Sequence, residues 1–334
     1  MREGLRRGAP AVGLFLLAPL VGEFLLGNQR IDWIFMVLPF ALLYGTGALL
    51  IRETVRRPGR GWPAIVLLAA AYALVEEGPV DQLRWTPSFG GGQHMLAGDA
   101  YLPALGTNIS VVQAVLSLHT IWSISVPIAL VETLVPERRT TPWLGRTGLA
   151  VTGVLFVLGA AAGYAESHGA GQCHATAGQL AGATVLIVAL VVLAFAIPYR
   201  PRQVDRTAPS PWLVGVVTLA LTSLLLYLVM FWPGRLNQWV SVACWCIVAA
   251  ALVTLIARFS RCRGWGAAHR LGLAAGALLT YAWVAFPHRP VSGSDARAHT
   301  VDLVGNTVFA LLAVVLIVLA ARVVHRSVRP AGAA

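Results

Sequence analysis

Apolar residues occur along this chain in long runs that short polar stretches separate, and the runs are about 20 residues long, enough to cross a bilayer core. Tryptophans lie at many of the run ends, as in the aromatic belts of membrane proteins. The pattern predicts about ten membrane-spanning helices. They cover residues 9–27, 32–51, 62–77, 107–135, 147–165, 177–198, 212–232, 238–258, 268–286 and 302–321. We therefore expect an all-α, polytopic integral membrane protein.

The positive charges indicate an orientation for these spans. All 25 basic residues are arginine, and placing the N-terminus in the cytoplasm puts twenty of them on the inner side of the membrane. The five that fall outside are Arg30, Arg84, Arg235, Arg289 and Arg297. Cytoplasmic loops of multi-pass proteins carry an excess of arginine and lysine. We therefore predict that both termini face the cytoplasm, in a protein of the plasma membrane.

Composition agrees with a membrane protein and excludes other classes. The chain of 334 residues is 57% hydrophobic and 12% charged, whereas a soluble domain has about a quarter charged residues. The net charge of +11 follows from arginines at helix ends, and no interleaving of aromatic and basic residues indicates a nucleic-acid surface. The expected partners are the lipid bilayer and a membrane-embedded or extracytoplasmic substrate. The pattern specifies no nucleic acid and no oligomeric state.

The clearest division along the chain is a polar, proline-containing stretch at residues 199–211, YRPRQVDRTAPSP, expected to be a cytoplasmic loop. A six-helix portion, residues 1–198, precedes it and holds most of the charges that fall inside predicted spans. A four-helix portion, residues 212–334, follows it and ends in a basic tail. We interpret both portions as parts of one membrane domain.

Four ionisable residues inside the predicted spans are expected at a similar depth, in the outer half of the bilayer. A charge in the hydrocarbon core costs about 3 kcal/mol or more, so charges that occur there are commonly paired or functional. Glu76 and Glu77 follow only about 20 Å of helix, less than the hydrocarbon thickness of about 30 Å. Glu23 lies at a similar rise in the first span, and His119 enters from the outside in the fourth.

The chemistry expected of this group is acid–base catalysis or metal binding. Two adjacent carboxylates in a low dielectric rarely ionise together, and a carboxylic acid beside a carboxylate suits general acid–base work. The same residues could hold a metal ion, with His119 as one ligand. Neighbouring helical residues point about 100° apart, so we expect one glutamate to face His119 and the other to pair with Arg84. Gly78-Pro79 is expected to end the helix within the bilayer.

Further polar residues of the fourth span support this group. Trp122 and Ser123 lie one turn after the histidine. Ser123 could serve as a nucleophile with a histidine base, although packing between membrane helices is the commoner role of serine. Near the inner surface, we expect Glu132 to pair with Arg138 or Arg139.

A third set of candidates lies at the outer mouth of the last span, in the sequence HTVDLVGN at residues 299–306. Its chemistry-bearing residues are His299, Asp302 and Asn306. Asp302 is expected to cap the N-terminus of that helix. Asp302 and Asn306 share one helix face, so they could also line the outer cavity.

The order of these residues resembles the motif series of a known family. Glu76-Glu77 at the end of a membrane helix, then His119, then His299 with Asp302, resembles the CAAX-protease and bacteriocin-processing family of intramembrane glutamate proteases. The resemblance extends over about 230 residues, from Glu76 to the start of the last predicted span.

The resemblance implies an intramembrane hydrolase in which Glu76 or Glu77 activates a water molecule. His119 would then hold that water or the oxyanion. Three positions depart from the family pattern. The family's arginine stands closer to the glutamates than Arg84 does, and Val115 stands where the family has phenylalanine. Asp302 follows His299 by three positions, where the family has its Asn or Asp four positions after the histidine. CAAX-processing members also work toward the cytoplasm, whereas this site is expected toward the outside.

Two other classes of function fit the same features. A proton-coupled small-molecule transporter would use the buried carboxylates as a proton relay, although the two portions show no matching inverted repeat. A non-enzymatic scaffold or sensor would instead read the outside through the long loop 78–106, with Glu76, Glu77 and His119 as structural residues.

Overall fold

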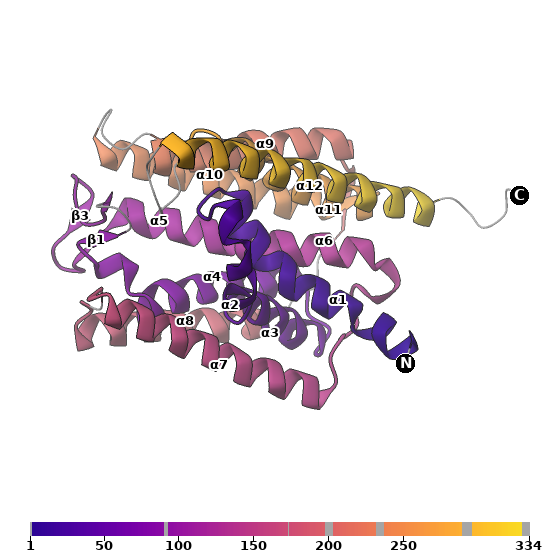
Figure 1. Ribbon diagram of the computed structural model, residues 1–334. Helices are drawn as coiled ribbons and strands as arrows, with labels where there is room; N and C mark the ends of the chain where they lie inside the picture. The colour runs from indigo at the N-terminus through magenta and orange to yellow at the C-terminus, as the bar shows by residue number, and fades with distance from the viewer. Residues whose placement is uncertain are drawn as a thin grey trace, which may run out of the picture.

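The computed structural model of the protein describes residues 2–89, 93–172, 174–197, 203–231, 237–288 and 296–328. Long helices run roughly alongside one another in a bundle, and the first residues of α1 lie at the same end of the bundle as the last turns of α12 (Figure 1). The α-helices are α1 (Arg2–Pro19), α2 (Val37–Ala41), α3 (Tyr44–Arg56), α4 (Trp62–Val75), α5 (Ile109–Ser117), α6 (Val126–Leu134), α7 (Arg146–Gly169), α8 (Ala177–Ala196), α9 (Pro211–Leu226), α10 (Gln238–Phe259), α11 (Ala267–Val284) and α12 (Ala296–Val328).

Shorter elements connect or extend these helices. Wider π-helical turns form η1 (Leu20–Leu25), η3 (Glu76–Val80), η5 (Leu118–Ser125) and η7 (Tyr227–Phe231), and tighter 3-10 turns form η2 (Ile31–Met36), η4 (Leu83–Trp85) and η6 (Pro136–Arg138). The strands are β1 (Ser88–Phe89), β2 (Gln93–His94), β3 (Tyr101–Leu102), β4 (Thr107–Asn108), β5 (Val204–Thr207) and β6 (Cys262–Arg263). β1–β2 and β3–β4 are antiparallel pairs at the end of the bundle opposite the start of α1 (Figure 1), and β5–β6 is a parallel pair.

The predicted helical, membrane-type architecture is confirmed. Within the described residues, eight helices are long and apolar enough to cross a membrane, or nine if the pair Ile31–Ala41 and Tyr44–Arg56, bent by 43°, forms one span. The eight are Gly8–Leu25, Trp62–Val80, Ile109–Leu134, Arg146–Gly169, Ala177–Ala196, Pro211–Phe231, Gln238–Phe259 and His299–Ser327.

The ninth predicted span, residues 268–286, is a helix, α11, but it is not among those eight. Its first turn carries His269 and Arg270, which lower its mean hydropathy, and its interior residues Ala274, Leu278 and Tyr281 are buried against the rest of the bundle. Most of α11 is therefore covered by neighbouring helices.

One continuous core joins the two portions that the sequence suggested. Its buried members include Phe24 and Trp122 from the first portion and Leu226, Tyr281 and Phe309 from the second. η1 and η5, which carry site residues, therefore pack directly against α11.

α9 and α11 approach closely enough for backbone contact because both present glycines. A Cβ atom added at Gly276 would collide with the carbonyl oxygen of Gly215, and one at Gly272 would collide with that of Pro211. Gly272 and Gly276 are four positions apart, the small-residue spacing that lets membrane helices pack tightly. This packing holds α11 in the middle of the bundle.

Candidate functional site

Three of the four π-helical segments in the described chain carry the ionisable residues expected at one depth. Glu23 lies in η1, Glu76 and Glu77 begin η3, and His119 lies in η5. η5 packs against η1 and against α4, the helix that leads into η3. π-helical turns inside longer helices often occur at functional sites, because the wider turn redirects side chains.

A proline adjoins each of these three segments. Pro19 precedes η1, Pro79 lies inside η3, and Pro127 follows η5 by two residues. Proline lacks the backbone N–H that would bond four residues back, so the regular α-helical ladder is interrupted there. In η3 the N–H of Asp81 bonds instead to the carbonyl of Glu76, five residues back, at 2.9 Å. The helix therefore continues past Gly78-Pro79 to Val80, and the predicted break at those residues is wrong.

The imidazole of His119 lies between the two glutamates. Its Nε2 atom is 2.9 Å from Oε1 of Glu77, and its Nδ1 atom is 3.1 Å from Oε2 of Glu76. All three side chains are buried, with 5% of Glu76, 5% of Glu77 and 6% of His119 exposed. The expectation that only one glutamate could face the histidine is wrong, because the two ring nitrogens point to opposite sides and the π-helical turn brings adjacent side chains closer together.

Two tyrosines that the sequence did not single out enclose this histidine. The ring centroids of Tyr44 and Tyr72 lie 5.8 Å and 6.2 Å from that of His119. On the same helix as His119, Ser123 places its Oγ atom 3.2 Å from Nδ1. The site is thus a buried polar cluster with aromatic walls, in which His119 hydrogen-bonds Glu77 and lies within ion-pair distance of Glu76.

Some buried polar atoms of this cluster have no hydrogen-bond partner among the described residues. Glu77 uses Oε1 for His119, while its Oε2 atom has no hydrogen-bond partner among the described residues. The Oε2 atom of Glu76 and the hydroxyl of Tyr72 also have no hydrogen-bond partner among these residues. Nearly all buried polar atoms in proteins are hydrogen-bonded, so unpartnered ones call for an explanation. An O–H group of water or substrate is a donor that fits Glu77 Oε2.

Arg84 reaches this cluster through the backbone rather than through a carboxylate. Its guanidinium donates to the carbonyls of Leu74 and Glu77, both at 3.3 Å, and stacks over Trp85. Gly78 makes room for it, since a Cβ there would collide with the guanidinium. Burial lowers the pKa of Arg84, and the negative charge of Glu77 opposes this shift.

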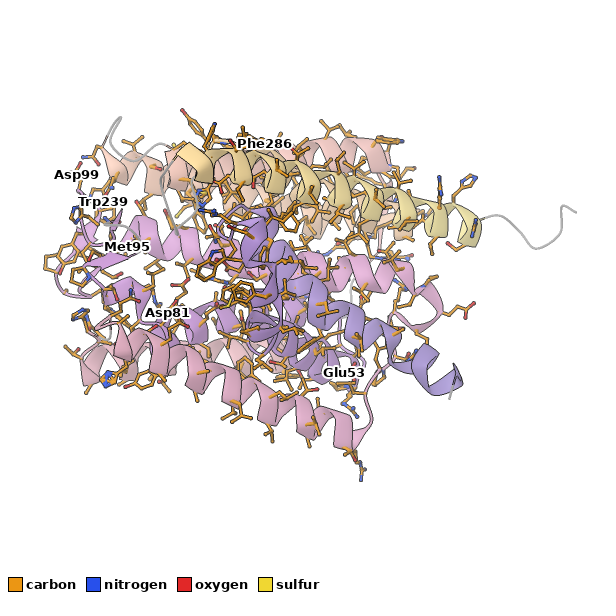
Figure 2. All side chains as sticks on the ribbon, viewed as in Figure 1. Glu53, Asp81, Met95, Asp99, Trp239 and Phe286 are labelled. Atoms are coloured by element: carbon orange, nitrogen blue, oxygen red, sulfur yellow. The ribbon has the colours of Figure 1, made fainter. Side chains whose placement is uncertain are left out.

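Asp81, directly after η3, adds a further carboxyl group that the sequence pattern did not indicate. Burial raises its pKa well above the usual value, and the neighbouring Glu77 raises it further. Its Oδ1 atom accepts a hydrogen bond from the N–H of Leu83 at 3.0 Å. In Figure 2, Asp81 lies toward the end of the bundle that carries the hairpins, and Glu53 lies toward the end where α1 begins.

Glu23 contributes to a second polar chain beside the histidine. Its Oε1 atom accepts from the hydroxyl of Tyr44 at 2.6 Å, and its Oε2 atom accepts from Asn28 at 3.3 Å. Asn28 in turn places Oδ1 2.8 Å from Nε2 of His288. Tyr44 is also close enough to Glu76 to interact electrostatically. A chain of polar groups thus connects the buried cluster to the half-buried His288 at the end of α11.

Trp122 anchors η5 instead of lining the cluster. Its indole N–H donates to the carbonyl of Ala277 at 2.7 Å, and its ring stacks on Tyr281 with centroids 4.4 Å apart. The side chain is fully buried. Trp122 therefore fixes η5 against α11, and this contact determines where His119 lies.

The outer-mouth candidates lie along α12 near the loop that follows η1. His299 is exposed, and Asp302 approaches Arg30 at 4.0 Å. Asn306 is buried and donates to the carbonyl of Ala285 at 2.7 Å. The expected role of Asp302 as an N-terminal cap is wrong, because α12 begins at Ala296 and Asp302 lies inside it.

A second buried charge network lies near the C-terminal ends of α3 and α6. Glu132 accepts from Arg56 at 2.8 Å and 2.7 Å and lies 3.1 Å from Nε of Arg52. Its expected partners, Arg138 and Arg139, were chosen because they follow it in sequence. The structure instead pairs it with α3, a long-range contact that proximity along the chain does not indicate.

Among the described residues, no group of three or more histidine, cysteine, aspartate and glutamate side chains is arranged to hold a metal ion. In the His119 cluster, the ring nitrogens and carboxylate oxygens contact each other directly. No known protein family, curated protein or solved structure matches the chain. The function is therefore inferred from the site itself.

Proposed function

We propose that this protein is a membrane-embedded hydrolase that cleaves an apolar substrate with water activated by Glu77. The observation that carries the proposal is the buried Oε2 atom of Glu77, which lacks a partner while Oε1 is held by His119 at 2.9 Å. A carboxylate fixed in this way presents one oxygen to an incoming O–H group, which is the arrangement a general base requires.

The proposed reaction assigns a role to each member of the cluster. Oε2 of Glu77 takes a proton from water as the water oxygen attacks the substrate carbonyl carbon. The proton then passes to the leaving nitrogen as the C–N bond breaks, which gives a carboxylic acid and an amine. His119 orients Glu77 and exchanges its proton with Glu76, whose Oε2 atom lies 3.1 Å from Nδ1. Tyr72, whose buried hydroxyl lies near Glu76, would donate to the oxyanion.

The burial of the cluster supports a substrate that enters from the membrane. Glu76, Glu77 and His119 are each at most 6% exposed, so a large soluble substrate has no direct access to them. A transmembrane segment that approaches between helices would bring its own apolar surface. The resemblance to intramembrane glutamate proteases, which rests on Glu76-Glu77 and His119, favours the same class of substrate.

We further propose that the chain lies in the plasma membrane with both termini in the cytoplasm and about ten spans, with α11 as an internal one. The distribution of arginines supports this orientation. It places the His119 cluster nearer the outer surface and the Glu132 network nearer the inner one.

The test uses the purified full-length protein in proteoliposomes with single-span apolar peptides that carry a fluorophore and a quencher. Cleavage in ¹⁸O-labelled water should place one heavy oxygen in the new carboxyl group, detected by mass spectrometry. Glu77→Gln should lower the rate by roughly 10²–10⁴-fold, the range for general-base catalysis. Glu166→Gln, at an exposed position on α7, is the matched control. Unchanged cleavage by a folded Glu77→Gln variant would overturn the proposal.

The polar chain from Tyr44 through Glu23 and Asn28 to His288 favours proton-coupled transport as a second candidate. Such a chain could carry protons between the buried cluster and one end of the bundle. In proteoliposomes, a transporter would move protons when a substrate gradient is applied, and Glu23→Gln would stop this movement. A hydrolase would cleave the peptides with no dependence on a proton gradient.

A further inference from the structure

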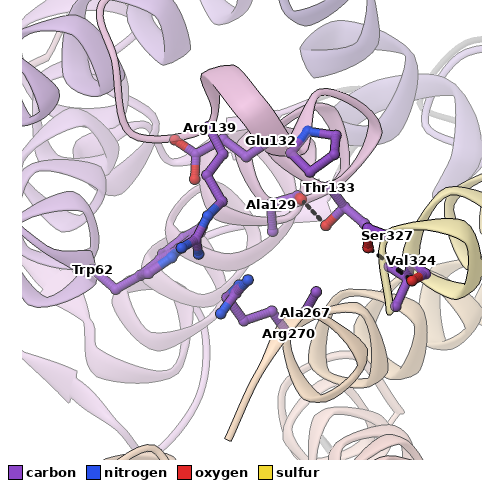
Figure 3. Close-up of a pocket in the computed structure, with 10 residues that line it drawn as sticks. Trp62, Ala129, Glu132, Thr133, Arg139, Ala267, Arg270, Val324 and Ser327 are labelled. Carbon is purple, nitrogen blue, oxygen red and sulfur yellow. Dashed lines mark hydrogen bonds between the residues drawn. The ribbon is translucent and has the colours of Figure 1, made fainter. Parts of the chain in front are cut away.

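A cavity of about 160 Å³ lies at the end of the bundle where α1 begins, well separated along the helices from the His119 cluster. The start of α4, the end of α6, the start of α11 and the end of α12 surround it (Figure 3). Its polar and aromatic lining residues are Trp62, Glu132, Thr133, Arg139, Arg270 and Ser327.

Two arginine side chains of this lining have no partner among the described residues. In the part of the chain that the structure describes, the side chains of Arg139 and Arg270 form no hydrogen bond or ion pair, although both are half-buried. Figure 3 shows their guanidinium groups directed into the same space. Holding two like charges together without a counter-ion is unfavourable, especially where water is partly excluded.

The one carboxylate in the wall cannot neutralise them. Glu132 is already bound by Arg56 through both oxygens, at 2.8 Å and 2.7 Å, and it also contacts Arg52. The charged groups that act on Arg270 are Arg139, Glu132 and Arg56, so two of the three are positive. The cavity therefore has an excess of positive charge.

The other polar groups that line the cavity do not favour a different kind of ligand. The hydroxyls of Thr133 and Ser327 donate to carbonyls of their own helices, at 2.7 Å and 2.8 Å. The N-terminus of α11 reaches the cavity through Ala267, and the dipole of an 18-residue helix adds positive potential there. The groups of the lining that remain free to bind a ligand are therefore positive and suit an anion.

We propose that this cavity binds a phosphate group through Arg139 and Arg270. The planar guanidinium matches the geometry of phosphate oxygens and can bind two of them at once. Trp62, which lines the cavity at the start of α4, is the residue type that marks the headgroup level of a bilayer. Two sources can supply the phosphate: the headgroup of an anionic phospholipid, as in basic pockets between membrane helices, or a free phosphate compound.

The test compares the wild type with the double variant Arg139→Gln/Arg270→Gln. The matched control is Arg258→Gln/Arg322→Gln, which removes the same charge from two exposed arginines outside the cavity. Native mass spectrometry would measure retained phosphatidylglycerol against phosphatidylcholine after release from mixed nanodiscs. Thermal unfolding in detergent would measure stabilisation by inorganic phosphate, with sulfate-free chloride at equal ionic strength as the reference.

We expect the cavity variant to lose retained phosphatidylglycerol, the phosphate response or both, with affinity roughly a hundredfold weaker because hydrogen bonds to a charged group each contribute about tenfold. Loss confined to the lipid identifies the headgroup as the source, and loss confined to phosphate identifies a free compound. Without ligand the variant should unfold at the same or a higher temperature than the wild type, because it removes facing like charges. Equal responses in the wild type and the cavity variant, or no response in either, would overturn the proposal.

Discussion

The Nε2 atom of His119 lies 2.9 Å from Oε1 of Glu77, across 42 positions of sequence. The other ring nitrogen is 3.1 Å from Glu76, so one imidazole joins two adjacent carboxylates. An isolated buried carboxylate is costly, so the contacts with the ring lower the cost of burying the two glutamates.

His119→Ala should therefore destabilise the protein strongly. It leaves two carboxylates facing each other without a donor, and breaking a buried charge pair costs about 3–5 kcal/mol. Adding Glu76→Gln and Glu77→Gln to that variant should restore part of the stability, because the like charges are removed. Thermal unfolding of the single and combined variants in detergent measures this coupling.

His168→Ala is the matched control, since His168 is exposed on α7. It should change the free energy of unfolding by less than about 0.5 kcal/mol. Additive effects of the histidine and glutamate substitutions would show that the three side chains do not interact.

A second prediction concerns the network around Glu132. Glu132→Ala leaves the guanidinium groups of Arg52 and Arg56 buried without their carboxylate, so the free energy of unfolding should fall by about 3–5 kcal/mol. Glu137→Ala, at an exposed position in η6, should change it by less than about 0.5 kcal/mol. Chemical denaturation in mixed micelles compares the two variants, and equal stabilities would contradict the network's role.

The glycine of the Glu-Glu-Gly sequence gives a third prediction. Gly78→Ala places a methyl group where the Arg84 guanidinium lies, and such overpacking typically costs about 1–3 kcal/mol. Gly153→Ala, inside α7 with open space around it, should instead stabilise the helix by up to about 1 kcal/mol. Opposite shifts in melting temperature are expected. A rise in both would show that Arg84 is not held against η3.

The sequence predicted the helical class and the candidate residues because both depend on local patterns. Apolar runs identify membrane helices directly, and the lengths before Glu76 and His119 are counted along single helices. These counts placed the two residues at a similar depth. They could not predict that both glutamates contact the ring, because the regular 100° step does not hold in the π-helical turn of η3.

Long-range pairings and close helix approaches were beyond the sequence pattern. Glu132 binds Arg56 across 76 positions. Nothing in the sequence distinguishes Arg56 from the many other arginines as its partner. Tyr44 and Tyr72 lie within apolar stretches, and nothing in the sequence marks them. Their contact with His119 depends on how three helices pack. The prolines beside η1, η3 and η5 were the available signal, since each lies within a few residues of an ionisable group.

The last prediction is a pH dependence caused by His288. Burial lowers its pKa from 6.5 to about 4 in the folded protein. Between these values the unfolded chain binds more protons than the folded one, so the free energy of unfolding is highest above pH 6.5 and falls as the pH drops toward 4. The full loss is about 3 kcal/mol, at 1.36 kcal/mol per pKa unit. His288→Asn keeps a donor for Asn28 and should reduce this slope, whereas His168→Asn, at an exposed site, should leave it unchanged. Equilibrium unfolding across this pH range measures the difference, and identical slopes for the wild type and His288→Asn would show that His288 titrates as freely in the folded state as in the unfolded one.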